Sequence, residues 1–461
     1  MGVGGASHGI ATVSQHSAAV QPSRRFALAG CHSSRHVTRM PHLAGMNKRQ
    51  FLRTMGGASI GLLLGDRVWA QYSALPPERL AADEPFWALI RSSYRLTPDY
   101  INLENGYFVM QSQPVLDAFV EHVRAINLEA SHYMRTRQFD DKLAVRARLA
   151  AMAGCSPSEL IITRNTTESL DTVIAGIDWK RDDEAIMAAQ DYGAMLDMFA
   201  LQSRRYGIVN RIVSLPINPA SDDELVQLYA RAITPRTRLL MVSHLVNITG
   251  QLLPVRAIAD MARSHGVQVM VDGAHSFAQL TFRIPDLGCD YFGASLHKWL
   301  GTPLGAGILY VRADRIAGLW PVFADLSMVD TDIRKLNHTG THPVHTDLAI
   351  NDAIDFHETI GIARKEARLR LLKEYWTSRV RGVPNVILNT PDDPRRSCAI
   401  ANVGIRNVSP STLAQTLLDA HRVWTVAIDS ANVHGVRITP SVYTSTADLD
   451  VFVNAIKRIA A

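Results

Sequence analysis

From Glu159 onward, short apolar runs alternate along the chain with longer stretches of helical periodicity. The apolar runs predict strands at 160–164, 184–190, 212–217, 238–245, 267–272, within 289–299 and at 305–312. Helical stretches lie between them near 165–177, 194–204, 221–233 and 255–265. Apolar strands that alternate with helices are typical of a parallel sheet covered on both faces. The pattern therefore predicts an α/β fold with a mostly parallel, doubly wound sheet.

The pattern changes on either side of this region. From Phe86 to about Ala153 it is mostly helical, with a turn-like break over 101–108. After Asp347 it predicts one long helix over 348–379, and then an α+β segment with strands near 386–389, 398–405, 423–428 and 435–439. We expect a large domain over 115–345 and a smaller α+β domain formed by 71–114 together with 346–461.

The net charge of +5 first suggests a nucleic-acid or membrane partner. The charges are unevenly distributed, because residues 1–70 hold eight Lys or Arg and one acid. The rest of the chain carries 40 basic and 42 acidic residues, a net charge of −2. No apolar run approaches the roughly 18 residues that span a bilayer. We therefore expect neither a nucleic-acid partner nor a membrane anchor, and the four cysteines show no spacing typical of a metal site.

Residues 46–70 resemble an export signal. Lys48 and Arg49 precede an apolar stretch over 58–64, and a small residue, Ala70, offers a cleavage position. The Lys-Arg pair stands where a twin-arginine signal has two arginines. We expect translation to start at Met46, with 1–45 as an upstream extension, and the mature protein to be periplasmic. The alternative is a cytoplasmic protein whose basic N-terminus carries no address.

Two motifs supply the chemistry. The segment VDGAHS, 271–276, places Asp272 at the end of an apolar strand, where a carboxylate is costly unless it meets a cation or a hydrogen bond. The glycine-rich segment GASLHKWLGTPLGAG, 293–307, contains Lys298, 26 residues after Asp272. Pyridoxal 5′-phosphate (PLP) needs a lysine that forms an imine with its aldehyde and a carboxylate that keeps its pyridine nitrogen protonated. Lys298 and Asp272 together predict PLP as the cofactor.

The segment from 271 to 312 resembles the signature of class V aminotransferases, within the fold type I PLP superfamily. Within that class the chain looks most like the isopenicillin N epimerase-like group, and it is also similar to twin-arginine-exported PLP enzymes of siderophore tailoring. The resemblance covers roughly 95–455. It implies that Lys298 is the Schiff-base lysine and moves the proton at Cα. It also implies that Asp272 pairs with the pyridine nitrogen.

The resemblance implies further cofactor contacts. The expected phosphate ligands are Thr166, Thr167, Ser295 and His297. Thr166 and Thr167 open a predicted helix, and backbone N–H groups at a helix N-terminus favour an anion. Tyr192 matches the position that stacks on the ring, and His275 would lie near its phenolic oxygen. Asn247 would reach that oxygen or the substrate carboxylate.

Three more residues follow from the resemblance. Arg437, in the segment 435–450, matches the arginine that clamps the substrate α-carboxylate, and its planar fork suits that role. Asn105 would sit near the substrate. Thr341, in HTGTHP, matches a residue that reaches the phosphate of the neighbouring subunit, which implies a homodimer with shared active sites.

The sequence leaves the reaction open. We expect transamination of an amino acid or a peptide-linked amino acid, with epimerisation at Cα as the alternative. Epimerisation usually needs a second acid/base group, for which Tyr107, Tyr133 and His275 are candidates. Cysteine desulfurase is disfavoured, because 423–437 contains no cysteine and Cys398 begins an apolar strand.

Two other classes of protein fit less well. A PLP-binding protein without turnover would not need to keep Lys298, Asp272 and Arg437 together. A Rossmann dehydrogenase would carry G-x-G-x-x-G after its first strand, and that motif is absent from this position. The sequence therefore favours an enzyme.

Overall fold

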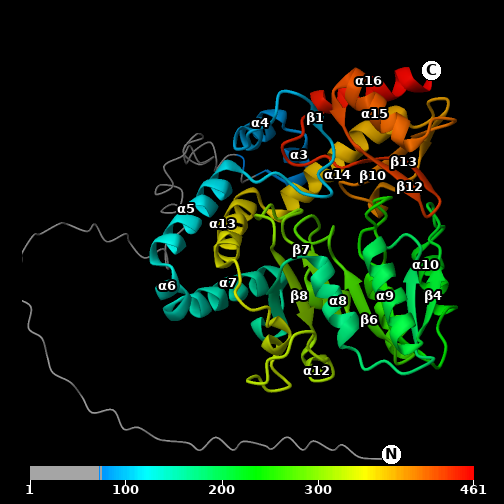
Figure 1. The fold of residues 1–461 in the computed structure, drawn as a ribbon. Helices are drawn as coiled ribbons and strands as arrows, with labels where there is room; N and C mark the ends of the chain where they lie inside the picture. The colour runs from blue at the N-terminus through cyan, green and yellow to red at the C-terminus, as the bar shows by residue number, and fades with distance from the viewer. Residues whose placement is uncertain (1–71, 73–74) are drawn as a thin grey trace, which may run out of the picture. The chain divides into compact units, whose positions relative to one another are not determined.

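A seven-stranded sheet, in the order β2-β8-β7-β6-β5-β3-β4, dominates the computed structural model, which describes Tyr72 and residues 75–461 (Figure 1). Its strands are β2 (Leu160–Thr163), β3 (Glu184–Ala188), β4 (Val209–Val213), β5 (Thr237–Ser243), β6 (Gln268–Asp272), β7 (Tyr291–Ser295) and β8 (Gly307–Val311). All neighbouring pairs are parallel except the two that β8 forms, with β7 and β2. The predicted mostly parallel α/β sheet is confirmed.

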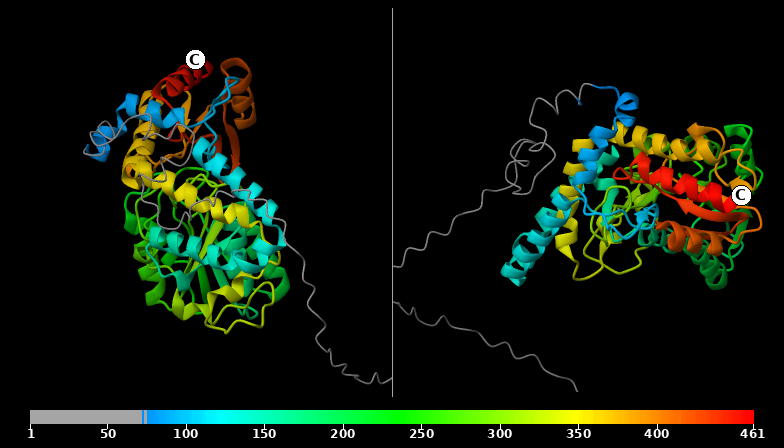
Figure 2. Two further views of the ribbon diagram at one scale, coloured as in Figure 1. Left: turned by 90° about the vertical axis from the view of Figure 1, so that its left-hand side faces the viewer. Right: turned by 90° about the horizontal axis from the view of Figure 1, so that it is seen from above.

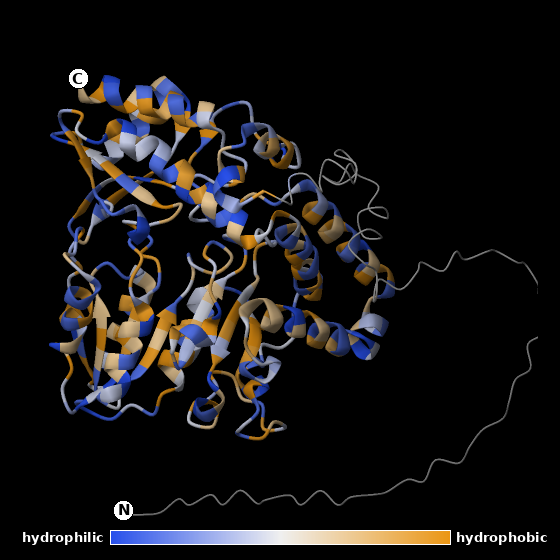
Figure 3. Ribbon diagram, turned by 180° about the vertical axis from the view of Figure 1, so that it is seen from behind, coloured by the Kyte–Doolittle hydropathy of each residue, from blue (hydrophilic) through white to orange (hydrophobic). Residues whose placement is uncertain are grey.

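Helices cover both faces of this sheet because its strands are apolar on both faces. In β2, Ile161 and Ile162 belong to different apolar clusters, since successive side chains of a strand point to opposite faces. Figure 3 shows the apolar colour concentrated on the strands of this sheet and the inner sides of its helices. The helices are α7 (Gln138–Ala153), α8 (Thr166–Gly176), α9 (Gly193–Tyr206), α10 (Asp222–Ala230), α11 (Val255–Ser264) and the short α12 (Ala313–Ile316).

Strand β4 departs from the prediction. The apolar run 212–217 predicts the strand, whereas the observed strand is Val209–Val213. β4 is an edge strand with exposed and half-buried side chains, so its paired residues are polar as well as apolar. The buried Leu215 lies beyond the strand, where its N–H donates to the Gln190 side chain at 2.9 Å. The apolar run therefore marks the segment that leaves the sheet.

A smaller region contains an antiparallel sheet in the order β12-β13-β10-β9 and a parallel pair, β1 with β11. Its strands are β1 (Ile101–Asn102), β9 (Val386–Leu388), β10 (Ala401–Ile405), β11 (Val423–Trp424), β12 (Val426–Ser430) and β13 (Val433–Ile438). The helices α15 (Pro410–His421) and α16 (Thr446–Ala460) pack on it, with apolar side chains shared between them and the strands. Because β1 pairs with β11, the start of the described chain joins its C-terminal part.

The helix predicted over 348–379 is in fact two helices, α13 (Val344–Ile360) and α14 (Ile362–Val380). Gly361 separates them with a φ of +86°, a conformation that a residue with a side chain rarely adopts. α13 packs against α5 (Gln113–Glu129) and α7, whereas α14 packs against α3 (Pro77–Ala81) and α16 (Figures 1 and 2). The break redirects the chain between the two groups of helices.

The remaining helices of the N-terminal part are α4 (Glu84–Ser92) and α6 (Ser131–Thr136). The described residues belong to one compact unit, so the boundary between a large and a small domain stays a prediction. The expected leader over 1–70 lies outside the described residues. None of the described helices is both long and apolar enough to cross a membrane.

Candidate active site

A cavity of about 440 Å³ opens at the carboxyl ends of the parallel strands, where α/β sheets place their ligands. It gathers ten of the residues expected from the sequence, from segments up to 271 positions apart in the chain. These are Thr166, Thr167, Tyr192, Asn247, Asp272, His275, Ser295, His297, Lys298 and Arg437. The rest of the lining is Gly106, Tyr107, Arg164, Asn165, Ser243, Leu245, Ala274, Leu304 and Gly305.

The sheet topology explains this convergence. Asp272 ends β6, and Ser243 ends the adjacent β5 as its registered partner. Ser295 ends β7 on the other side of β6. β8 runs in the opposite direction, so the segment that enters it, with Leu304 and Gly305, reaches the same edge. Gly305 has a φ of +88°, which a glycine adopts without strain.

Lys298 lines the cavity at this edge and is half-buried. Its Nζ is 3.1 Å from Nε2 of His275. Burial lowers the pKa of the Lys298 amine to about 8, while Asp272 opposes that shift and Arg437 adds to it. Such an amine is still mostly protonated at neutral pH, but its nucleophilic, deprotonated fraction is far larger than that of an ordinary lysine.

The Trp299 side chain fixes the tautomer of His275. Trp299 Nε1 can only donate a hydrogen bond, and it lies 3.3 Å from His275 Nδ1. Nδ1 is therefore the acceptor, and in the neutral ring the proton resides on Nε2. Burial and the nearby Lys298 lower the pKa of His275 well below its usual value, so the ring stays neutral. When the Lys298 amine is deprotonated, His275 Nε2–H can donate to its lone pair across this 3.1 Å contact.

Asp272 is a buried carboxyl group with one clear backbone donor. The Ala274 N–H donates to Asp272 Oδ1 at 2.9 Å. Burial raises the pKa of Asp272, and the hydrogen bond and Lys298 offset that rise only in part. A second cation inside the cavity would stabilise the charged carboxylate. A protonated pyridine nitrogen is such a cation.

Ser243, the partner of Asp272 on the adjacent strand, binds a second carboxyl group, that of Asp191. Ser243 Oγ donates to Asp191 Oδ1 at 2.7 Å, and the Ala188 N–H donates to Oδ2 at 2.7 Å. Burial raises the pKa of Asp191 to about 7, and Asp272 contributes to the rise. Asp191 itself does not line the cavity, so its hydrogen bonds position the end of β3 and the following Tyr192.

The N-terminus of α8 forms one wall. Asn165 caps the helix through Oδ1, which accepts from Glu168 N at 2.9 Å. Ser295 Oγ lies 2.9 Å from the Thr166 N–H and 2.8 Å from Thr166 Oγ1, which joins β7 to the helix start. Gly307 permits this close approach, because a Cβ there would lie 2.7 Å from the Asn165 backbone. Backbone N–H groups and hydroxyls at a helix N-terminus suit a phosphate group.

His297 adds an unused polar atom to this wall. Its Nδ1 is buried and has no hydrogen-bond partner among the described residues. Burial and Lys298 lower the pKa of His297 to about 4, so the ring is a neutral hydrogen-bonding group. A buried polar atom without a partner is costly, and a ligand in the cavity would relieve that cost. The residues present therefore fit PLP: an amine for its aldehyde, a carboxyl for its pyridine nitrogen and a helix start for its phosphate.

Two tyrosines border the cavity. Tyr192 precedes α9 and is 46% exposed, and Tyr107 is 77% exposed. Their rings lie at the solvent side of the lining, where a flat ligand could stack against one of them. Tyr192 as the stacking residue and Tyr107 as an acid/base group stay predictions. The Asn247 backbone oxygen accepts from Arg437 Nη1 at 3.3 Å, and its side-chain role likewise stays a prediction.

Arg437, on β13, reaches the cavity from the small sheet and is already paired. Its Nη2 and Nε donate to the Glu104 carboxylate at 2.6 and 3.2 Å. The two side chains are 9% and 7% exposed. The predicted clamp arginine is thus in place, but a carboxylate of the same chain occupies one edge of its fork.

Three expected residues do not line the cavity. Asn105 is fully buried, and its amide bonds to Thr439 O at 2.7 Å and to the Tyr443 hydroxyl. It anchors the loop whose next residues, Gly106 and Tyr107, line the cavity, and its place near the substrate stays a prediction. Tyr133 is buried on α6 and donates to Asp141 at 2.7 Å, so it is not an acid/base group of this cavity. Thr341 lies in a separate hollow with residues of α6 and α7, and its contact with a partner subunit stays a prediction.

Several functional residues were not found from the sequence. Glu104 stands in the turn-like segment 101–108, and only the fold brings it to Arg437, 333 positions later. Ser243 ends an apolar strand as Asp272 does, and that position could have marked it. Trp299 gave no signal beyond its place next to Lys298.

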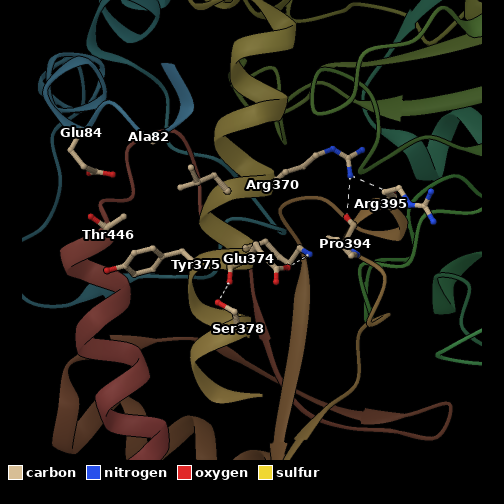
Figure 4. A pocket seen from close by; sticks show the side chains of 11 residues that line it. Ala82, Glu84, Arg370, Glu374, Tyr375, Ser378, Pro394, Arg395 and Thr446 are labelled. Carbon is tan, nitrogen blue, oxygen red and sulfur yellow. Dashed lines mark hydrogen bonds and ion pairs between the residues drawn. The ribbon is translucent and has the colours of Figure 1, made fainter. Parts of the chain in front are cut away.

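Another hollow of about 800 Å³ lies beside α14 and the start of α16, with side chains including Glu84, Tyr375 and Arg395 (Figure 4). It contains none of the residues predicted for PLP or substrate. Its charged groups point along the surface and pair with near neighbours, as Arg395 does with Asp393 at 2.8 Å. The chemistry therefore belongs to the smaller cavity at the strand ends.

Comparisons with known proteins agree with this site. A family model described as aminotransferase class-V matches residues 110–448. The isopenicillin N epimerase of Amycolatopsis lactamdurans is 29% identical over 394 residues, which cover 81% of this chain and 98% of that protein. The isopenicillin N epimerase of Streptomyces clavuligerus is 27% identical, over 68% of this chain and 83% of that protein. A probable cysteine desulfurase of Pseudomonas aeruginosa is 30% identical over 52% of this chain and 59% of that protein.

Solved structures share the fold. A cysteine desulfurase of Thermococcus onnurineus NA1 aligns with a TM-score of 0.72 at 20% identity, over 80% of this chain and 97% of that one. The cystine C–S lyase C-DES, solved with its reaction product cysteine persulfide, aligns with a TM-score of 0.70 at 21% identity, over 78% of this chain and 97% of that one. Family match, fold and site agree, so the chain belongs to the class-V aminotransferase family of fold type I enzymes, and its cofactor is pyridoxal 5′-phosphate.

Proposed function

We propose that this enzyme transaminates a small amine substrate, an amino acid or a peptide-linked amino acid. The observation that carries the proposal is the contact between Lys298 and His275. Both groups line the cavity, both can carry a proton, and their nitrogens lie 3.1 Å apart. Proton carriers gathered at one place suit a transfer along one side of the substrate, as transamination requires.

When bound, PLP draws electrons from the substrate carbon that bears the amine and thereby makes its hydrogen acidic. Lys298 Nζ would take that proton from the substrate carbon and hold it on the same side for return. His275 Nε2 lies 3.1 Å from this amine and positions it at the cavity wall. Asp272 holds a positive charge at the far end, and the α8 N-terminus with Ser295 holds a negative one.

Epimerisation at Cα is the second candidate, and the isopenicillin N epimerases among the relatives favour it. It would need a proton delivered from the face opposite Lys298. Tyr107 lines the cavity and is the hydroxyl group open to that role. His275 contacts Lys298 and therefore does not serve an opposite face.

Cysteine desulfuration is disfavoured in spite of the desulfurases among the relatives. Within the described part of the chain, Cys155, Cys289 and Cys398 are free, and none of them lines the cavity. Burial raises the pKa of each thiol to about 12, which keeps the nucleophilic thiolate scarce. A persulfide-accepting cysteine is thus missing from the cavity wall.

The test is mass spectrometry of the cofactor after incubation of the holoenzyme with amines in deuterated water. Transamination predicts conversion of PLP to pyridoxamine 5′-phosphate, with the keto product in equal amount. Unchanged PLP together with deuterium at the substrate Cα and loss of optical rotation would replace the proposal by epimerisation. Tyr107→Phe separates the two, since only epimerisation requires its hydroxyl.

Two wider expectations belong to the same proposal. Export through a twin-arginine route rests on residues 46–70 of the sequence, and it would place the folded, PLP-loaded enzyme in the periplasm. A homodimer rests on Thr341, which would reach the partner's phosphate site. Cell fractionation and light scattering test them, and a cytoplasmic monomer would contradict both.

A further inference from the structure

The Arg437–Glu104 pair is the feature of the cavity that PLP chemistry does not require. Each nitrogen of the Arg437 guanidinium already has an acceptor: Nε and Nη2 bond to Glu104, and Nη1 bonds to the Asn247 backbone oxygen. The guanidinium also lies flat against Gly106, where a Cβ would come within 2.9 Å of Cζ. The arginine is thus held and neutralised before any substrate arrives.

Glu104 is fixed as firmly as its partner. The Tyr107 N–H donates to Glu104 Oε1 at 2.9 Å, and the Glu104 N–H donates to Asn102 Oδ1 at 2.9 Å. The loop behind it is anchored, because Thr439 Oγ1 accepts from the Asn105 N–H at 2.6 Å. Moving the Glu104 carboxylate away from Arg437 would also break its hydrogen bond from the Tyr107 N–H, because the backbone of this loop is held in place.

A substrate carboxylate at Arg437 would therefore meet a second carboxylate. Two like charges on one buried cation leave a net negative charge in a region of low dielectric, and like-charge contacts in such places cost several kcal/mol in general. A carboxamide oxygen would accept the remaining Arg437 N–H groups without that repulsion. The pair thus offers hydrogen-bond donors to the substrate but no net positive charge.

We propose that Glu104 is a specificity-determining residue that makes the cavity select amines whose neighbouring carboxyl is an amide, as in a peptide-bound residue, over free α-amino acids. This inference rests on the proposed function, because it names the substrate class of the same site. It also assigns a reason to the buried pair, which would otherwise weaken the carboxylate clamp that Arg437 resembles.

The test compares the wild-type holoenzyme with Glu104→Gln on a panel of L-amino acids and their α-carboxamides. The wild type should show a higher kcat/KM for the carboxamides, by about tenfold or more. Glu104→Gln should lower KM for the free acids about tenfold and leave KM for the carboxamides within about twofold. A wild type that prefers free acids, with a KM unaffected by Glu104→Gln, would overturn the proposal.

The Glu84–Arg368 pair provides a matched control. Arg368 is buried as Arg437 is, and its Nη1 lies 2.6 Å from Glu84 Oε1. Neither residue lines the cavity at the strand ends. Glu84→Gln removes the same charge and should leave the ratio of acid to carboxamide turnover unchanged. A change in that ratio would show that selectivity responds to charge anywhere in the molecule, which would contradict a local role for Glu104.

A binding measurement keeps this inference separate from the proposed function. Propionate and propionamide carry the carboxylate and the carboxamide but no amine, so calorimetry with them needs no turnover. The wild type should bind propionamide more tightly, and Glu104→Gln should reverse the order. If no amine reacts while this reversal is seen, the proposed reaction fails and the role of Glu104 stands. Tighter binding of propionate by the wild type contradicts the role of Glu104 even without a variant.

Discussion

Two lysines of this molecule, Lys298 and Lys365, have similar surroundings at first sight. Burial lowers the pKa of Lys298 to about 8 and that of Lys365 to about 7. Both lie beside a histidine with a lowered pKa, His275 in one case and His357 in the other. The second lysine, on α14, donates to the Trp299 backbone oxygen, one residue after Lys298.

The two regions differ in what surrounds the amine, and Lys298 is half-buried whereas Lys365 is buried. Lys298 lines a cavity together with a carboxyl group, a donating imidazole and an arginine. Lys365 does not line that cavity, and its amine serves a carbonyl group of the protein itself. A lowered pKa therefore marks an unusual environment, whereas access to a cavity with complementary groups marks a site.

Replacing each lysine in turn should give the largest difference in turnover between two variants. Lys298→Ala should lower turnover at least about 1,000-fold, because it removes both the cofactor link and the proton carrier. Lys365→Met has nearly the same volume as the original side chain and should keep turnover within about threefold. Steady-state kinetics and the visible absorbance of bound PLP measure both variants. Equal losses in the two variants would erase the distinction between the regions.

Asp272 and Asp191, two buried carboxyl groups at the same edge of the sheet, provide a second comparison. Asp272→Asn should lower turnover about 100-fold, because a neutral amide no longer stabilises a charge in the cavity. Asp191→Asn should lower thermal stability and cost less than about tenfold in turnover. Its amide nitrogen would face the N–H and O–H donors that Asp191 now accepts. A larger kinetic loss for Asp191→Asn than for Asp272→Asn would reverse their roles.

Trp299→Phe tests a residue that contacts both lysine regions. Its Nε1 contacts His275, and its backbone oxygen accepts from Lys365. Loss of the Nε1–H removes the donor to His275 Nδ1, so turnover should fall up to about tenfold, the value of one neutral hydrogen bond. The pKa of His275 should rise, because Nδ1 becomes free to accept a proton. The acid limb of the kcat/KM profile should then move to higher pH.

Trp376→Phe is the control for this variant. Trp376 is equally buried, but it lies in the core of the small region and its Nε1 has no hydrogen-bond partner among the described residues. It should leave the pH profile in place. A shift of the profile in Trp376→Phe, or none in Trp299→Phe, would argue against a fixed tautomer.

The smallest expected effect concerns stability, because the titration of Lys365 should make the free energy of unfolding depend on pH. Its pKa in the folded chain, about 7, is below the ordinary value of 10.5, so the unfolded chain binds more protons between these two pH values. The free energy of unfolding should therefore rise as the pH rises from about 7 to 10. Lys365→Met should flatten this rise in chemical denaturation of the holoenzyme. An identical slope in the two proteins would contradict a neutral Lys365.

The sequence predicted the sheet and most of the cavity for a local reason. Buried strands are short apolar runs, and the polar residues that end them, such as Asp272 and Ser295, converge because parallel strands share an edge. The break at Gly361 was missed because the apolar periodicity continues across it. Only the φ of +86° reveals the turn.

Contacts between distant segments could not be predicted from the sequence. Glu104 and Arg437 meet because β1 pairs with β11 and the following loop folds over β13, and no local pattern encodes that. The same holds for Asn105, whose segment was expected at the substrate. Its amide is used by Thr439 and Tyr443.

The most direct test of Lys298 as the PLP-binding lysine is to reduce the holoenzyme with borohydride and locate the cofactor by peptide mass spectrometry. Reduction makes the bond between PLP and its lysine permanent. If Lys298 binds PLP, one peptide should be modified, with the added mass on Lys298, and Lys365 should be unmodified. A modification on Lys365, or none on Lys298 in a protein that binds PLP, would contradict it.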